Sequence, residues 1–190
     1  NKIEQTTSAN GRKDMKVIGN SLPRYNYNFG ISADWYGIDF SVLFQGIGKQ
    51  NWYPGAETSM FWGPYSRPYA SFIPSDFMSQ VWSEENTNAY FPRPRGYVAL
   101  GSNRELAVVN TKYLQNLAYC RLKNLSIGYT LPDKWLSKIG FEKIRVYFSG
   151  ENLLTFTKLH SDYIDPEQAS ASNSWKTSKS DANIYQEIGR

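Results

Sequence analysis

Apolar and polar residues alternate most clearly over residues 27–35. The apolar set is Tyr27, Phe29, Ile31, Ala33 and Trp35, and the polar set between them is Asn28, Gly30, Ser32 and Asp34. Successive side chains of a strand point to opposite faces, so this period of two predicts a strand with one apolar face. After Tyr36 and Gly37 the alternation resumes through residues 38–45. Two such runs with so short a join predict a β-hairpin.

A second hairpin is predicted over residues 118–151. Its first strand places Leu125, Ile127 and Tyr129 on one face, but Leu122 is out of phase with them. One extra residue near Lys123 and Asn124, a β-bulge, would repair the register. The connector after Pro132 has the features of one short helix, which are an apolar stripe (Trp135, Leu136 and Ile139) and then Gly140 to end it.

Residues 46–118 have no such periodicity and are rich in Pro, Gly, Ser and aromatic residues. Within them, Ser75 is placed to cap a short helix with Phe77, Met78, Val81 and Trp82 on one stripe. A loop this long inside a compact domain is usually functional. Disordered linkers are poor in aromatic residues, so we predict an ordered loop that faces a ligand or a partner.

The four strands are expected near residues 25–36, 38–45, 118–131 and 143–151, with long loops over 46–117 and 153–190. Each strand has about the 9–11 residues that a tilted strand needs to cross a bilayer. Short joins that alternate with long loops are typical of an outer-membrane barrel. Lipid does not tolerate an open sheet edge, and four strands cannot close a barrel. Either the chain is a piece of a larger barrel, or the membrane interpretation is wrong. The fold that we predict is all-β, an antiparallel up-and-down portion of a transmembrane barrel with long extracellular loops and short helices.

Composition supports this interpretation without deciding it. Of the 190 residues, 16% are aromatic, and such side chains favour strands and membrane–water boundaries. The net charge of +4 is scattered along the chain, so we expect no nucleic-acid partner. The chain has one cysteine, no run of apolar residues that could form a transmembrane helix, and no apolar signal segment in its first residues.

Catalytic and metal-binding patterns are weak. His160 is the only histidine, and nothing near it in sequence could activate Cys120 as a nucleophile. Zinc requires more Cys and His ligands than these two. Asp162, Asp165 and Glu167 depart from the spacing of a calcium loop and are expected to form a solvated acidic turn. We therefore expect no catalytic residue, no metal site and no cofactor, and we do not expect an enzyme.

The aromatic residues of the long loop are the remaining candidates for ligand or partner contact. Aromatic rings stack on sugar rings and supply much of the surface of binding pockets. The candidates are Trp52, Tyr53, Trp62, Tyr65, Tyr69 and Trp82. The competing hypothesis carries more weight: these rings pack a small core of the loop itself or meet a partner protein, because large ordered loops need internal packing.

Four segments resemble the C-terminal barrel region of SusC/RagA-type TonB-dependent outer-membrane transporters. They are VIGNSLPRY (residues 17–25), GIDFSVLFQGIG (37–48), YCRLKNLSIGYTLP (119–132) and RVYFSGENL (145–153). The resemblance spans most of residues 16–167 and implies that residues 1–190 are one part of a much longer chain. It implies that the N-terminal plug and the last strand are absent from this sequence.

The resemblance also implies a function. Transporters of this family lie in the outer membrane, import oligosaccharides or peptides with a SusD-like surface lipoprotein, and are energised by TonB through the plug. The implied partners are therefore that lipoprotein, the rest of the barrel and its plug, TonB, membrane lipid and the ligand. The loop over residues 46–118 is expected outside the cell and the short joins in the periplasm.

Two readings of the alternation follow. In the transporter reading, Phe29, Ile31, Trp35, Phe40, Val42, Ile127, Val146 and Phe148 face lipid, while Asn28, Asp34, Asp39, Arg145 and Ser149 face the lumen. The alternative is a soluble carbohydrate-binding β-sandwich, in which the same apolar side chains face a protein core and tryptophans form a sugar platform. The two differ in what covers the apolar face.

Overall fold

The computed structural model describes residues 15–56, 58–66, 73–94, 99–101, 106–137, 140–171 and 183–187. The chain divides into two compact units. The sheet unit consists of residues 23–49 and 118–158. The loop unit consists of residues 50–117 with the segments that precede residue 23 and follow residue 158.

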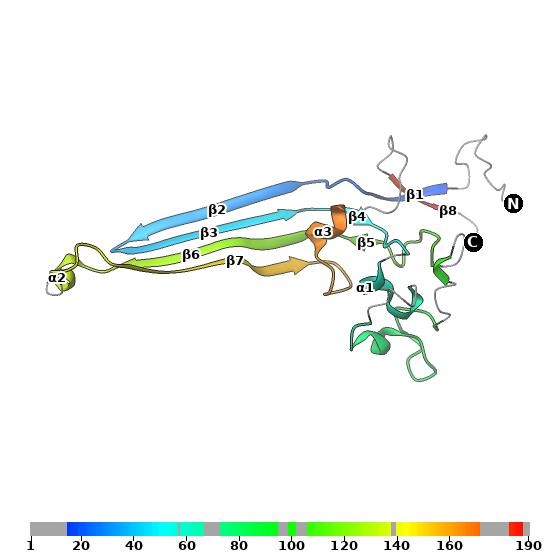
Figure 1. Ribbon diagram of the computed structural model, residues 1–190. Helices are drawn as coiled ribbons and strands as arrows, with labels where there is room; N and C mark the ends of the chain where they lie inside the picture. The colour runs from blue at the N-terminus through cyan, green and yellow to red at the C-terminus, as the bar shows by residue number, and fades with distance from the viewer. Residues whose placement is uncertain are drawn as a thin grey trace, which may run out of the picture. The chain divides into compact units, whose positions relative to one another are not determined.

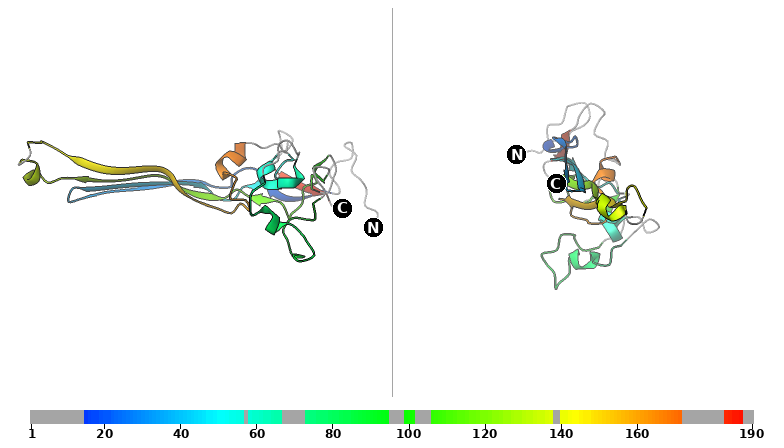
Figure 2. Two further views of the ribbon diagram at one scale, coloured as in Figure 1. Left: turned by 60° about the horizontal axis from the view of Figure 1, so that its bottom comes forward. Right: turned by 90° about the vertical axis from the view of Figure 1, so that its left-hand side faces the viewer.

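The sheet unit is one antiparallel sheet of four strands in the order β2-β3-β6-β7. Its strands are β2 (Asn26–Trp35), β3 (Ile38–Ile47), β6 (Tyr119–Thr130) and β7 (Arg145–Thr157), which lie side by side in Figure 1. The turned views in Figure 2 show that the sheet twists along its length. All four strands occur close to where the alternation predicts them, but β7 runs on to Thr157, past the expected end at residue 151.

The join between β2 and β3 is a two-residue turn with left-handed backbone at both positions. Tyr36 has φ 46° and Gly37 has φ 83°. Turns of this hand match the twist of the strands that they join. A Cβ atom on Gly37 would lie 2.8 Å from the carbonyl oxygen of Thr130, whose N–H donates a 2.7 Å hydrogen bond to the Gly37 carbonyl. Glycine is therefore required for both its φ and its close contact with β6.

The predicted bulge is present at Lys123. On the β3 side, Leu43 pairs with Asn124 while Phe44 pairs with Leu122, so the register skips one position at Lys123. The register with β7 shifts at the same place. Bulges of this kind bend a strand and bring later side chains back into phase. As a result Leu122 shares a face with Leu125 and Ile127.

The join between β6 and β7 contains the short helix α2 (Asp133–Leu136). Leu136 is buried whereas Trp135 is exposed, and Gly140 has φ 75°, which suits its expected place after the helix. Ile139, the third residue of the predicted stripe, lies outside the described residues.

The loop unit contains short elements: β4 (Asn51–Trp52), α1 (Ser59–Trp62), the 3-10 helices η1 (Gly63–Tyr65) and η3 (Phe77–Gln80), β5 (Gln115–Asn116) and α3 (Pro166–Ala171). The helix expected after Ser75 occurs as η3 but ends before Val81, and its N-cap is Asp76, with no side-chain cap hydrogen bond, so the prediction that Ser75 caps it is wrong. β4 pairs with β5, so the two ends of residues 50–117 meet. The N–H of Leu117 also donates a 2.8 Å hydrogen bond to the Gln50 carbonyl.

The polar ends of the chain differ from expectation. Strand β1 (Met15–Asn20) pairs antiparallel with β8 (Asn183–Glu187), although residues 153–190 are expected to form a long loop and no strand is expected near residue 15. Pairing of this kind joins backbone groups and needs no apolar alternation, so the hydrophobic pattern does not reveal it.

Candidate functional site

One face of the sheet is apolar and largely exposed, although Val42 on the central strand β3 is buried. Directly opposite residues of antiparallel strands share a face, and the register aligns Ile31 with Val42 and Val42 with Leu125. All eight residues expected to face lipid lie on this face. Ile31 is 59% exposed, Val146 63% and Phe148 58%, which are high values for strand residues of this type. Contiguous apolar surface of this kind marks a face that another phase or molecule covers.

Aromatic side chains lie near both ends of this face. At the two-residue turn, Trp35 and Tyr36 meet edge to face, with ring centroids 5.2 Å apart. Towards the other end, Phe29 stacks on Phe44 at 4.9 Å. Aromatic residues at both boundaries with aliphatic residues between them are typical of strands that cross a bilayer.

The opposite face is polar. A row of four serines crosses all four strands, because Ser32 pairs with Ser41, Ser41 with Ser126, and Ser126 with Ser149. The five residues expected to face a lumen (Asn28, Asp34, Asp39, Arg145 and Ser149) lie on this face in the same register. The sheet therefore has one surface suited to hydrocarbon and one suited to water.

An ion pair spans three strands on the polar face. Arg145 donates from Nε to Oδ1 of Asp39 at 2.9 Å and from Nη2 to Oδ2 at 2.5 Å. Its guanidinium also lies 5.0 Å from the ring centroid of Tyr147. Gly128 on β6 lies between the partners, and a Cβ atom there would be 2.5 Å from Asp39 Oδ1. The glycine thus leaves room for a two-point contact between β3 and β7.

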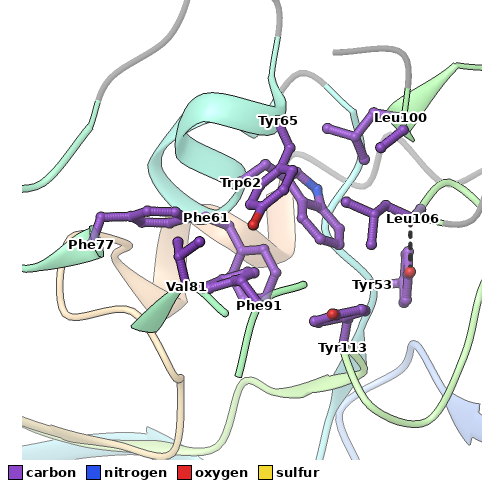
Figure 3. Close-up of a cluster of buried hydrophobic side chains, with 11 residues drawn as sticks. Tyr53, Phe61, Trp62, Tyr65, Phe77, Val81, Phe91, Leu100, Leu106 and Tyr113 are labelled. Carbon is purple, nitrogen blue, oxygen red and sulfur yellow. Dashed lines mark hydrogen bonds between the residues drawn. The ribbon is translucent and has the colours of Figure 1, made fainter. Parts of the chain in front are cut away.

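The loop unit has a core of aromatic side chains. Its largest members are Tyr53, Phe61, Trp62, Tyr65, Phe77, Phe91 and Tyr113 (Figure 3). Phe77 and Phe91 stack with centroids 4.8 Å apart, and Phe61 meets Trp62 edge to face at the same separation. Such pairs contribute about 0.5–1.5 kcal/mol beyond the area they bury. The segment therefore has its own folded core.

The polar tips of these rings are satisfied by backbone groups. Trp62 Nε1 donates to the carbonyls of Pro54 and Gly55 at 3.1 and 3.0 Å, and the Tyr53 hydroxyl donates to the Leu106 carbonyl at 2.8 Å. The Tyr65 hydroxyl bonds to the Pro92 carbonyl. Burial raises the pKa of Tyr53 and Tyr65 well above the usual range, so both remain neutral donors at physiological pH.

The six aromatic candidates have different positions. Trp62 and Tyr65 are 0% exposed, and Trp52 and Tyr53 are also buried. Trp82 is half-buried, and Tyr69 lies outside the described residues. Stacking on a ligand needs an accessible ring face, and within this chain the faces of Trp52, Tyr53, Trp62 and Tyr65 are covered. Packing of the loop's own core accounts for Tyr53, Trp62 and Tyr65, and direct ligand contact by any of the six stays a prediction.

A surface pocket of the loop unit was not anticipated from the sequence. It lies between η3 and residues 160–163, and its lining is Met60, Phe61, Pro74, Asp76, Phe77, Gln80, Phe91, His160, Ser161, Asp162 and Tyr163. Residues from four separate stretches of the chain form it, so no local pattern could have revealed it. His160, the only histidine of the sequence, is part of this pocket.

The described part of the chain contains neither a metal-binding cluster nor a helix that could span a membrane. No three His, Cys, Asp or Glu side chains gather there as ligands for a metal ion. None of the helices there is long and apolar enough to cross a membrane.

Comparison with known proteins identifies relatives of this chain. It is 35% identical to "TonB-dependent receptor P3" of Formosa agariphila and 28% identical to "TonB-dependent receptor P26" of the same organism, each over 156 residues. Each alignment covers 81% of this chain and 14% of the receptor, so the chain spans a small part of these relatives' length. No family model matches.

Among solved structures, the RagAB peptide importer in its "closed-closed" state is similar with a TM-score of 0.50 and 25% identity. The match covers 77% of this chain and 15% of that one. The resemblance to SusC/RagA-type TonB-dependent transporters is confirmed, as are the mainly antiparallel strands with few short helices. These relatives are named as receptors and an importer, and none as an enzyme.

Proposed function

We propose, on the premise that this chain is similar to a segment of TonB-dependent receptors, that it forms part of the wall and outer loops of an outer-membrane nutrient importer. The observation that carries the proposal is the two-faced sheet of four long strands. Its apolar face contacts lipid and its polar face, with the serine row and the Asp39–Arg145 pair, lines the lumen.

The open edges of the sheet agree with this role. β2 and β7 each pair with one neighbour in the described sheet, so a backbone edge of each strand lacks a partner there. Unpaired backbone groups are costly in hydrocarbon, so both edges continue into further strands of a closed barrel. The remainder of the barrel and its plug supply those strands and the contact with TonB.

The strand register supports one orientation. Asn26, Ile47, Tyr119 and Thr157 lie at the same end of the sheet, and the long segments leave from that end. Outer-membrane barrels have short periplasmic turns and long outer loops. The loop unit therefore faces the cell exterior, where it meets the ligand and a SusD-like surface lipoprotein.

The ligand is an oligosaccharide or a peptide, and a peptide is favoured. The similar solved structure is titled a peptide importer, whereas the aromatic rings suited to sugar stacking are mostly buried in the loop core. Trp52, Tyr53, Trp62 and Tyr65 are buried, so among the described candidates Trp82 is the position that we propose for ligand or partner contact.

The alternative β-sandwich is less well supported. A sandwich packs a second sheet against the apolar face, and its residues then have little exposure. Ile31, Val146 and Phe148 are more than half exposed, which agrees better with lipid contact than with a packed core.

Thiol labelling of the full-length protein in outer membranes tests the proposal. In a Cys120→Ala background, Ile31→Cys and Phe148→Cys probe the apolar face, while Ser32→Cys and Ser149→Cys are matched controls on the polar face. We expect a bimane fluorophore to be quenched by brominated lipid only at the first pair, and a small charged thiol reagent to label only the second. Equal labelling of all four positions by the charged reagent would contradict the lipid-facing assignment.

A further inference from the structure

We propose that the pocket between η3 and residues 160–163 binds the cationic tip of a lysine or arginine side chain of an imported peptide. The inference rests on the proposed function and adds a site and a preference to it. For brevity we call this hollow the Asp76 pocket.

The Asp76 pocket has two acidic groups in its lining. Phe77 and Phe91 also border it, but they are 3% and 2% exposed and stack on each other, so their ring faces are covered. Asp76 and Asp162 supply two carboxylates, and no lysine or arginine is among the lining residues. Carboxylates attract a cation through charge and through charge-assisted hydrogen bonds.

Neither carboxylate has an opposite charge to neutralise it among the described residues. The Tyr163 hydroxyl donates to Asp76 Oδ1 at 3.2 Å, which orients that carboxylate without cancelling its charge. Nothing in the described part of the chain forms a salt bridge with Asp76 or Asp162. A ligand with one positive charge is therefore complementary to this pocket.

The pocket wall is held in place by His160. Its ring stacks on Tyr90 with centroids 3.8 Å apart, its Nε2 lies 2.7 Å from Gln80 Oε1, and its backbone N–H donates to Gln115 Oε1 at 3.1 Å. Burial lowers the pKa of His160, so the imidazole is neutral at pH 7 and does not offset the two carboxylates. A wall fixed in this way needs little ordering when a ligand binds.

The pocket has room for the end of a side chain. Its cavity volume is about 60 Å³, several times the roughly 10–15 Å³ that one water needs on the same measure. An ammonium with its neighbouring methylene, or a guanidinium, fits this space. Because the described residues form no metal-ligand cluster, an organic cation matches the pocket better than a metal ion.

Binding of paired peptides to the full-length transporter in nanodiscs tests the inference. The probes are an N-acetylated alanine pentapeptide with a central lysine and the same peptide with norleucine, which keeps the stem and removes the charge. The test variant is Asp76→Asn with Asp162→Asn, since asparagine keeps the acceptor for Tyr163. The control is Asp133→Asn, which removes an exposed carboxylate in α2 of the sheet unit.

We expect the native protein to bind the lysine peptide about tenfold more tightly than the norleucine peptide. The norleucine side chain lacks the ammonium group and so loses the charge-assisted hydrogen bonds to the carboxylates of the pocket. The double variant should abolish this difference and the control should retain it. Equal affinities in the native protein, or a preference that survives in the double variant, would overturn the inference. Weakened binding of the surface lipoprotein with unchanged peptide preference would also overturn it, by assigning the pocket to that partner.

TonB-dependent uptake of the same peptides, measured in parallel, separates this result from the proposed function. Uptake that requires TonB but shows no preference for lysine would leave the importer intact and reject the pocket. Absence of any TonB-dependent uptake would reject both.

Discussion

Arg145 on β7 reaches over β6 to hold both carboxylate oxygens of Asp39 on β3, with Gly128 directly beneath the pair. Both side chains are partly exposed, so the pair is screened and its strength depends on geometry more than on burial. Its position matters because it joins strands that share no backbone hydrogen bonds.

Adding a methyl group at Gly128 should break this contact. We expect Gly128→Ala to lower the temperature at which the full-length barrel loses its compact form on a denaturing gel, because the new Cβ atom would occupy the site of the ion pair. Gly30→Ala is the control, since its nearest contact would be 3.3 Å. In the native background, Gly128→Ala should lower this temperature more than Gly30→Ala does. In an Asp39→Ala background, which lacks the ion pair, the two alanine variants should lower it equally. Equal effects in both backgrounds would contradict this explanation.

Replacement of Gly37 should weaken the first hairpin. Gly37→Ala forces a Cβ atom into left-handed backbone, which costs roughly 1–2 kcal/mol, and adds the contact with the Thr130 carbonyl. We expect a corresponding drop in the free energy of unfolding, measured by urea titration in lipid vesicles. Tyr36→Asn is the matched control, because asparagine tolerates φ 46° better than tyrosine. An unchanged free energy of unfolding in Gly37→Ala would contradict this expectation and show that the turn relaxes around the new side chain.

Truncation of Trp62 should unfold the core of the loop unit. Trp62 is fully buried, and Trp→Ala changes in cores cost about 3–5 kcal/mol. We expect hydrogen exchange to accelerate across the aromatic core while residues 119–130 keep their protection. Met78→Ala, at an exposed position of η3, should change stability by less than about 0.5 kcal/mol. Unchanged exchange in Trp62→Ala would refute a self-contained core.

Acidification should loosen the contact made by His160. Burial lowers its folded-state pKa below the ordinary value, with Asp162 opposing in part. As the pH falls below about 6.5, the unfolded segment therefore binds more protons than the folded one. The stability that the contact contributes at neutral pH is then lost as the pH falls further. We expect faster hydrogen exchange in residues 159–169 at pH 5.5 than at pH 7.5, after correction for intrinsic rates. His160→Gln should remove this pH dependence; if it persists, another group is responsible.

The sheet could be predicted from the sequence because its signal is local. Residues two apart decide which face is apolar, so the strands, the turn at Tyr36 and the bulge at Lys123 all follow from short stretches. The β1–β8 pair could not be found in this way, because it joins polar segments from opposite ends of the chain.

The role of the loop aromatics could not be decided from the sequence either. Trp62 and Trp82 are the same residue type in the same long segment of the chain, yet one is buried and the other partly accessible. Burial depends on contacts such as that of Trp62 with Tyr113, which is distant in sequence. The Asp76 pocket has the same origin, since Asp76 and Asp162 meet only through tertiary folding.

The meeting of Gln50 and Leu117 across β4 and β5 has an evolutionary consequence. The segment between them has its own core, and its two ends lie side by side. Recombination can therefore replace such a segment as a unit without changes in the rest of the protein. Sequence change in such a segment would let one barrel acquire new ligand specificities, while selection acts separately on the barrel strands.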